Sequence, residues 1–345
     1  MRGLFTAGVL DVLMERGIEP AHTVGVSAGA AFGCNVKSRQ QGRAIRYNKR
    51  FCADARYAGW GNLLRTGDLY SVEFAYRTVP LELDPFDTKA FRENPARFTV
   101  VATDIDTGEA VYRDVRRGDV EDLDWIRASA SIPLLARPVE LAGRKLLDGG
   151  IADSIPVRWM LGQGYRRTVV VLTQPRGYRK EPNRLMPLLR AGLHRYPKLL
   201  ARLADRHLRY NETLDAIERL EREGRIFVVR PSETVAAPVM VRDPEVLERI
   251  YQVGRRDAAA QIAALEAYLG PAGADEPSVT ERPVAASAVG ERPVAGRVAS
   301  ERPVAAPAVE ERPVAAPAPS SPAVPATAPA SSSPAVPAAP KEVRA

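Results

Sequence analysis

Residues 22–34 read His22-Thr23-Val24-Gly25-Val26-Ser27-Ala28-Gly29-Ala30-Ala31-Phe32-Gly33-Cys34, and this stretch decides the fold. Its first five residues are typical of a short strand, and the small residues after Ser27 are typical of a helix packed closely on a sheet. Between them, Gly25-Val26-Ser27-Ala28-Gly29 matches G-x-S-x-G, a tight strand-to-helix turn that presents a serine hydroxyl at a helix N-terminus. Glycine on either side of Ser27 prevents clashes in such a turn. An N-capping serine in a glycine-rich turn is the other interpretation, and the context favours a nucleophile.

Strands and helices alternate through much of the chain. The apolar patterns predict a helix over 4–15, strands over 97–103, 109–113, 168–173 and 225–230, helical structure over 185–217, and a helix from Asp243 to about Leu269. The β-branched run at 168–173 is typical of a strand buried on both faces. The alternation predicts an α/β protein with a three-layer α/β/α architecture and a mainly parallel central sheet.

Composition divides the chain near residue 270. Fifteen of its 29 prolines lie between Pro271 and Pro340, and no leucine, isoleucine or aromatic residue follows Leu269. Without large apolar side chains, burial cannot offset the entropy of ordering the backbone, so we expect residues 271–345 to be a disordered Pro/Ala-rich tail with Glu-Arg-Pro-Val repeats. Residues 1–270 remain for one folded domain, in which 176–270 form a C-terminal helical and strand extension.

The positive charge is concentrated in one segment. The net charge is +7, yet residues 176–209 hold ten bases against Glu181 and Asp205, so the rest of the folded part is close to neutral. This argues against a nucleic-acid partner. Two cysteines make neither a disulfide framework nor a zinc site, and no apolar run approaches the roughly 18 residues of a membrane span. We expect a cytoplasmic protein without a metal or cofactor.

Residues 185–210 combine these bases with leucines at helical spacing, broken near Pro197. A leucine face that covers the sheet explains the pattern, and this interpretation is slightly favoured. A basic amphipathic helix that lies on an anionic membrane explains it as well, which leaves a peripheral membrane contact open.

A serine nucleophile needs a base, and the chain has only three histidines. His22 lies in the strand that enters the turn, where its side chain is expected to pack or meet solvent rather than reach Ser27. Asp148 is the strongest alternative. It ends the apolar pair of Leu146-Leu147-Asp148-Gly149-Gly150, and the two glycines allow backbone and substrate to approach closely. An ordinary strand-ending turn is the other interpretation.

Together with Ala128-Ser129-Ala130-Ser131-Ile132-Pro133, these two motifs resemble the patatin-like phospholipase family, and 83–87 and 153–156 are similar to segments of a bacterial branch of it. The family consists of serine acyl hydrolases that use a Ser–Asp dyad without histidine. The resemblance covers roughly residues 1–270. It implies a patatin-like fold and a lipid ester substrate, with Ser27 as nucleophile and Asp148 as base, and Gly149 and Gly150 completing the dyad motif.

Met1-Arg2-Gly3-Leu4 also looks like the end of the family's glycine-rich oxyanion loop. In the family a buried strand and a run of glycines come directly before the Arg-Gly pair, so we expect the native protein to begin upstream of Met1. Losing one oxyanion donor typically costs about 10²–10³ in kcat. The remaining candidate donors are the amides of Arg2 and Gly3 and that of Ala28, the residue after the nucleophile.

Two other readings stay open. His194 and His207 follow Ser27 and Asp148 in the order of a Ser-Asp-His α/β-hydrolase triad, although both fall in the basic helical segment. The chain could instead be a catalytically impaired module that binds a lipid surface or a protein. Asp104 and Asp106 precede Thr107-Gly108, where two acids are expected to shape a turn rather than hold a cation. Lipid head group, chain length and oligomeric state are not predicted.

Overall fold

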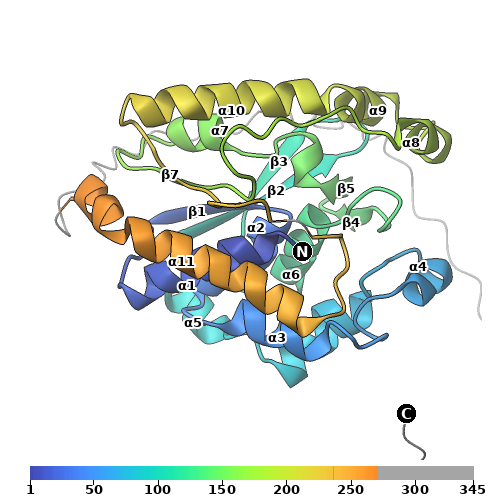
Figure 1. Ribbon diagram of the computed structural model, residues 1–345. Coiled ribbons are helices and arrows are strands. Elements are labelled where there is room, and N and C mark those ends of the chain that lie inside the picture. The colour runs from blue at the N-terminus through green and yellow to red at the C-terminus, as the bar shows by residue number, and fades with distance from the viewer. Residues whose placement is uncertain (236, 271–345) are drawn as a thin grey trace, which may run out of the picture. The chain divides into compact units, whose positions relative to one another are not determined.

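The structure is a computed structural model that describes residues 1–235 and 237–270, so the predicted tail lies outside the described residues. Its strands are β1 (His22–Val26), β2 (Arg97–Asp104), β3 (Ala110–Asp114), β4 (Val139–Leu141), β5 (Arg144–Asp148), β6 (Val169–Val171) and β7 (Phe227–Val229). Its helices are α1 (Gly3–Glu15), α2 (Ala28–Lys37), α3 (Arg43–Phe51), α4 (Trp60–Thr66), a π-helix (Phe74–Leu83), α5 (Thr88–Glu93), α6 (Val120–Ser129), a 3₁₀ turn (Gly149–Ile151), α7 (Val157–Leu161), α8 (Met186–Gly192), α9 (Pro197–Ala204), α10 (Arg206–Arg222) and α11 (Pro244–Leu269). Figure 1 shows their arrangement.

The described strands form two sheets. One has the order β1-β2-β5-β4 with β3 also paired to β2, and the other pairs β6 with β7. β1–β2 and β6–β7 are parallel, whereas β2–β3, β2–β5 and β4–β5 are antiparallel. The expected mainly parallel sheet is therefore wrong, and the larger sheet is mixed. The reason is local, because tight turns with left-handed glycines at Gly108 and Gly143 fold two pairs of strands back as hairpins.

Helices cover both faces of the strands, which gives the predicted three-layer α/β/α architecture. The short strands β6 and β7 show it most simply, since alternate side chains of a strand point to opposite faces. Val170 and Val228 pack with α7 and α10, whereas Val169 and Val229 pack with α1 and α11. Figure 1 shows β7 between α10 above and α11 below.

The strand predicted at 168–173 is shorter than expected and is not buried throughout. Val170 is buried, whereas Val169 and Val171 are half-buried. The edge of β6 that is not paired with β7 borders a cavity. The edge of β1 that is not paired with β2 borders the same cavity. The cavity thus separates the two sheets.

The basic segment folds into α8, α9 and the start of α10, with the expected break before Pro197. Leu189, Leu193, Leu199 and Leu203 are buried against the 105–151 region, as the packing interpretation expects. Leu185 and Leu188 depart from it, since they are 58% and 57% exposed. Packing therefore explains only part of this leucine pattern.

Helix α11 is the main support of α1, and the two helices cross at glycines. A methyl group on Gly8 would lie 2.2 Å from the Tyr251 carbonyl oxygen, and one on Gly254 would lie 2.1 Å from the Phe5 carbonyl oxygen. The Tyr251 hydroxyl donates a 2.7 Å hydrogen bond to the buried Asp11 carboxylate across this contact. Because α1 begins beside Ser27, this crossing also positions the start of the site.

Gly254→Ala is expected to destabilise the protein by about 1–3 kcal/mol, because its methyl group cannot fit without separating α1 from α11. Urea denaturation followed by circular dichroism measures the change in unfolding free energy. Gly61→Ala in α4 is the matched control, since a methyl group there meets no atom within 4 Å. We expect the control to be neutral or stabilising by up to about 1 kcal/mol. Equal effects of the two substitutions would contradict the proposed crossing.

Candidate active site

Ser27 stands at the junction of β1 and α2 in a strained backbone conformation. Its φ is 55° and its ψ is −119°, and it is one of four described non-glycine residues with positive φ. Such strain costs about 1–3 kcal/mol and persists only where the surrounding structure enforces it. Gly25 is required, since a methyl group there would lie 2.6 Å from Ala30 Cα. Gly29 is not required in this way, because a methyl group would meet nothing within 4 Å, so the steric reason expected for it is wrong.

The structure brings Ser27 and Asp148 together across 121 residues of sequence. The Ser27 hydroxyl donates a 2.6 Å hydrogen bond to Asp148 Oδ2. The other carboxylate oxygen, Oδ1, accepts a 2.8 Å hydrogen bond from the Gly150 amide. Both carboxylate oxygens are thus fixed in direction, and one of them faces the serine proton.

Burial makes Asp148 a stronger base than an ordinary carboxylate. Its side chain is nearly withdrawn from solvent, and this desolvation raises the pKa of its carboxyl. The hydrogen bond from Ser27, the nearby Arg206 charge and the hydrogen bond from Gly150 oppose that rise without cancelling it. A carboxylate with a raised pKa accepts a proton from a hydroxyl more readily.

Gly149 and Gly150 allow this arrangement in different ways. A methyl group on Gly149 would lie 2.0 Å from the Val101 carbonyl oxygen, so only glycine lets the chain pass this close to β2. Gly150 supplies the amide that holds Asp148 Oδ1. Thr103 of β2 secures the same turn through a 2.8 Å hydrogen bond from its hydroxyl to the Asp148 carbonyl oxygen.

Ser129 belongs to the site, although its residue type alone did not reveal it. Its hydroxyl oxygen accepts a 2.8 Å hydrogen bond from the Ser27 amide, and it lies fully buried at the end of α6. Two residues later, the Ser131 carbonyl oxygen accepts a 2.8 Å hydrogen bond from the Asp148 amide. The segment 128–133 therefore holds both members of the pair. The only sequence signal for it was its place in the family resemblance.

The expected oxyanion residues converge beside Ser27. Arg2 and Gly3 open α1, and Ala28 opens α2, so their amides belong to first helical turns, which have no acceptor within their own helix. The two helix starts touch, because a methyl group on Gly3 would lie 2.4 Å from Ala28 Cβ. Two helix N-termini that meet at one point favour negative charge there.

The three histidines make other contacts. His22 Nε2 lies 2.7 Å from Thr99 Oγ1, its ring packs edge-on against Trp159 and Tyr165, and burial lowers its pKa to about 4. His194 and His207 each contact a backbone carbonyl three residues earlier in the chain. Within the described residues, none of the three hydrogen-bonds to Ser27 or Asp148.

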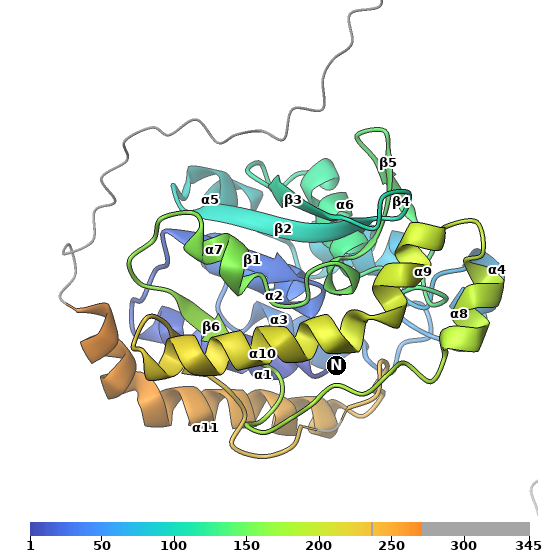
Figure 2. The same ribbon diagram turned by 90° about the horizontal axis from the view of Figure 1, so that it is seen from above.

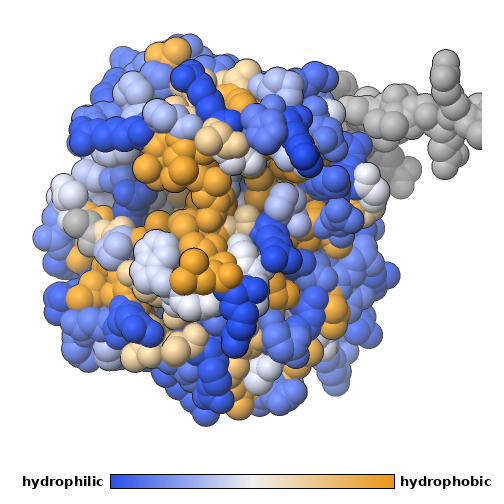
Figure 3. All heavy atoms as spheres, turned by 90° about the vertical axis from the view of Figure 1, so that its right-hand side faces the viewer, coloured by the Kyte–Doolittle hydropathy of each residue, from blue (hydrophilic) through white to orange (hydrophobic). Residues whose placement is uncertain are grey.

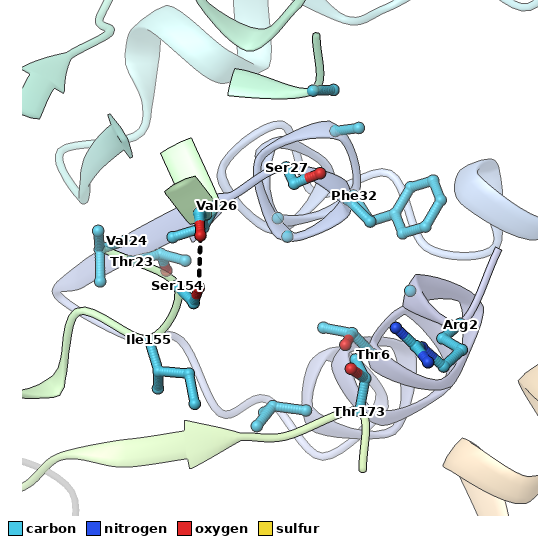
Figure 4. Close-up of a pocket in the computed structure, with 18 of the residues that line it drawn as sticks. Arg2, Thr6, Thr23, Val24, Val26, Ser27, Phe32, Ser154, Ile155 and Thr173 are labelled. Atoms are coloured by element: carbon cyan, nitrogen blue, oxygen red, sulfur yellow. Dashed lines mark hydrogen bonds between the residues drawn. The ribbon is translucent and has the colours of Figure 1, made fainter. Parts of the chain in front are cut away.

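A cavity of about 1670 Å³ opens at this pair, larger than the usual range for small-molecule sites. Figure 4 shows Ser27, Phe32 and the β1 residues on one wall, with Ile155 and Thr6 across from them. Apolar side chains predominate. Trp60 and Leu63 of α4 line the cavity, as do Leu188 of α8 and Leu185 directly before α8. These two helices lie at the same end of the molecule in Figures 1 and 2, and Figure 3 shows apolar surface around a hollow on that side.

The remaining polar candidates have structural roles. Asp104 Oδ1 accepts hydrogen bonds from the amides of Asp106 and Thr107 at 2.9 and 3.1 Å, so it shapes the turn as expected. Among the described residues, no group of three or more His, Cys, Asp or Glu side chains could hold a metal ion. No described helix is long and apolar enough to cross a membrane.

Comparison with known proteins identifies the family of this chain. The family model described as patatin-like phospholipase matches residues 1–160, and one described as a domain of unknown function matches residues 196–270. The uncharacterized protein YjjU of Escherichia coli (strain K12) is 30% identical over 264 residues, which cover 74% of this chain and 72% of YjjU. The chain belongs to the patatin-like phospholipase family.

The matches to other relatives cover a smaller share of those proteins. Uncharacterized NTE family proteins of Mycobacterium bovis and Mycobacterium tuberculosis are 30% identical over 174 residues, 49% of this patatin-like chain and 45% of theirs. The chain therefore spans less than half the length of these mycobacterial relatives. The crystal structure of VipD from Legionella pneumophila aligns with a TM-score of 0.36 at 14% identity, over 76% of this chain and 65% of that one.

Replacing Asp148 by asparagine is expected to stabilise the fold near neutral pH. Since burial raises the pKa of this carboxyl in the folded state, the folded protein holds the proton more tightly than the unfolded chain does. Ionisation of Asp148 therefore opposes folding once the pH exceeds its ordinary pKa of about 3.9. Asp148→Asn removes that penalty and keeps the shape.

Urea unfolding of the two proteins at pH 3 and pH 7 measures this difference. We expect the variant to be the more stable protein at pH 7, and the advantage to shrink toward pH 3 as the native carboxyl becomes protonated. A variant that is less stable at pH 7 would contradict the proposed burial of an ionised carboxylate.

Proposed function

We propose that this patatin-like protein is a serine acyl-ester hydrolase that acts on lipids through an acyl-enzyme, with Ser27 as nucleophile and Asp148 as general base, in a catalytic domain over residues 1–270. One observation carries the proposal: the 2.6 Å hydrogen bond from Ser27 to a buried carboxylate, made by a serine in a strained strand-to-helix turn. A nucleophile and base within about 2.6–3.2 Å satisfy the geometric requirement for proton transfer.

The first half of the reaction follows from this geometry. As the Ser27 oxygen attacks the ester carbonyl carbon, its proton moves to Asp148 Oδ2, the atom it already faces. The carbonyl oxygen gains negative charge, and the amides of Gly3 and Ala28 stabilise it in this proposal, which the close contact of the two helix starts supports. Asp148 then returns the proton to the departing alcohol, leaving the acyl group on Ser27.

The second half uses the same groups in reverse. Water enters as the alcohol leaves, and Asp148 removes a proton from it as the water oxygen attacks the acyl carbon. The bond between that carbon and the Ser27 oxygen then breaks, and Asp148 returns the proton to Ser27 as the carboxylic acid is released. The Gly150 amide keeps the carboxylate directed at the reacting oxygen throughout. Apolar walls next to Ser27 favour an ester with an apolar acyl chain.

We further propose that the segment 185–210 contacts anionic lipid surfaces. Leu185 and Leu188 are exposed beside the mouth of the cavity, with Arg184, Arg190 and Arg195 close along the chain. Exposed apolar side chains among bases are suited to a negatively charged interface, where each base contributes about 1 kcal/mol. Such a contact would bring the cavity mouth to its substrate.

Ser27→Ala is expected to abolish labelling by a fluorophosphonate serine probe and to lower hydrolysis of p-nitrophenyl octanoate at least about 10³-fold, because no other group supplies the nucleophile. Gel fluorescence and absorbance at 405 nm measure the two effects. Equal labelling of the native chain and the variant would overturn the assignment of Ser27, and absence of labelling in both would favour a non-catalytic binding module.

The double variant His194→Ala/His207→Ala is the control for the base. We expect it to keep its labelling and hydrolysis, since neither histidine contacts Ser27 or Asp148 in the described structure. A loss as large as that of Ser27→Ala would instead support a Ser-Asp-His triad.

Binding to phosphatidylglycerol vesicles is expected to exceed binding to phosphatidylcholine vesicles and to weaken with salt, as electrostatic attraction does. Leu185→Ser/Leu188→Ser should lower the vesicle affinity by tenfold or more, given about 1.5–3 kcal/mol for each buried leucine. Vesicle co-sedimentation measures both effects, with Leu81→Ser, an exposed leucine of the π-helix, as the matched control. Salt-independent binding, or an equal effect of the control, would contradict the membrane contact.

A further inference from the structure

Three basic side chains from separate parts of the chain line the cavity together with Ser27. Arg2 precedes α1, Lys180 lies between β6 and α8, and Arg206 begins α10. Figure 4 places Arg2 beside Thr6 and Thr173 on the cavity wall. Lys180 and Arg206 come from the part of the chain beyond the match to the patatin-like model.

None of the three is ion-paired within the described residues. Arg206 donates from Nε to the Gly150 carbonyl oxygen and from Nη2 to Ser154 Oγ at 3.2 Å. The Lys180 ammonium lies 5.3 Å from the centre of the Tyr210 ring. Two bases of the same segment that do not line the cavity are ion-paired, since Arg176 pairs with Glu221 and Arg179 with Asp215 at 3.0 and 2.5 Å.

Two of the three carboxylates that line the cavity are paired with other cations: Glu19 pairs with Arg39, and Glu266 pairs with Arg16. The third, Asp148, offsets part of the Arg206 charge, which leaves three cations against one carboxylate. The described cavity wall therefore carries a local excess of positive charge beside the nucleophile.

The three cations are close enough to repel one another. Burial, together with the charges of Arg206 and Arg2, lowers the pKa of Lys180 to about 8. Arg2 and Arg206 also act on the Tyr210 hydroxyl. Mutual repulsion among like charges is relieved when an anion lies between them.

We propose that Arg2, Lys180 and Arg206 form a subsite that binds the phosphate of an anionic phospholipid whose ester is held at Ser27. The subsite rests on the proposed function, which it deepens by naming the substrate class. Guanidinium groups offer forked donors that match phosphate oxygens, and an ammonium adds a mobile third donor. A head group without its own cation, as in phosphatidate, suits three positive side chains. A choline head group brings a further positive charge into the same space.

The subsite is tested on short-chain lipids that dissolve as monomers, so that attraction to a membrane surface does not enter. The substrates are dihexanoyl phosphatidate, dihexanoyl phosphatidylcholine and dihexanoylglycerol, and the variants are Lys180→Met and Lys180→Arg. Arg176→Met is the matched control, because Arg176 is a base of the same segment that pairs with Glu221 away from the cavity.

We expect the native protein to prefer phosphatidate over phosphatidylcholine in kcat/KM. Lys180→Met should lower kcat/KM for phosphatidate about tenfold, mostly through KM, and leave dihexanoylglycerol unchanged. Lys180→Arg should restore the preference, and Arg176→Met should not alter it. A loss of the same size on all three substrates, or no loss on phosphatidate, would overturn the subsite.

A binding measurement keeps this test separate from catalysis. In the Ser27→Ala background, dihexanoyl phosphatidate should raise the melting temperature, and adding Lys180→Met should remove that rise. If no ester is hydrolysed but this rise is seen, the proposed function fails and the phosphate subsite stands. No rise with phosphatidate overturns the subsite, and an equal rise with inorganic phosphate overturns its assignment to a lipid.

Discussion

The hydrogen bond between Ser27 and Asp148 is the constraint on which the rest of the site depends. It joins a strand-to-helix turn near the start of the chain to a strand end 121 residues later, and both partners are held in positions that cost free energy. Ser27 has positive φ, and Asp148 is a carboxylate withdrawn from water. Neither the backbone conformation of Ser27 nor the burial of the Asp148 carboxylate is favourable by itself, so the surrounding structure must hold both residues in place.

That enforcement comes from short backbone contacts rather than from a large apolar core. Gly149 passes against the Val101 carbonyl oxygen, which brings the end of β5 level with the end of β1 through the intervening β2. Ser129 and Ser131 then fix the amides of Ser27 and Asp148 at 2.8 Å each. Four segments distant in sequence therefore meet at one point, where small changes in position would alter the proton transfer distance.

The charges around this point are arranged asymmetrically. Arg206 contacts the Gly150 carbonyl oxygen, and its charge opposes the rise that burial causes in the pKa of Asp148. With Lys180 and Arg2 it also leaves positive charge facing the cavity. The Arg206 guanidinium thus acts on Asp148 and also belongs to the subsite that we propose binds the phosphate of the substrate.

The sequence by itself determined the local elements and indicated the chemistry that we propose. The strand, the turn and the helix around Ser27 follow from residue type and spacing, and so does the helix that Asp243 caps through its side chain. Asp148 was a candidate because it ends an apolar pair and is followed by two glycines, and the family resemblance favoured it over an ordinary strand-ending turn. Tertiary structure decided the direction of β5 relative to β2, since these strands are distant in sequence and pair antiparallel, whereas alternation alone had suggested a mainly parallel sheet. It also decided that Gly29 has no steric role, that Ser129 accepts a hydrogen bond from the Ser27 amide, and that Lys180 and Arg206 lack ion-pair partners in the described chain whereas Arg179 and Arg209 have them. These properties depend on which segments meet in space, and local periodicity carries no information about contacts between residues a hundred positions apart.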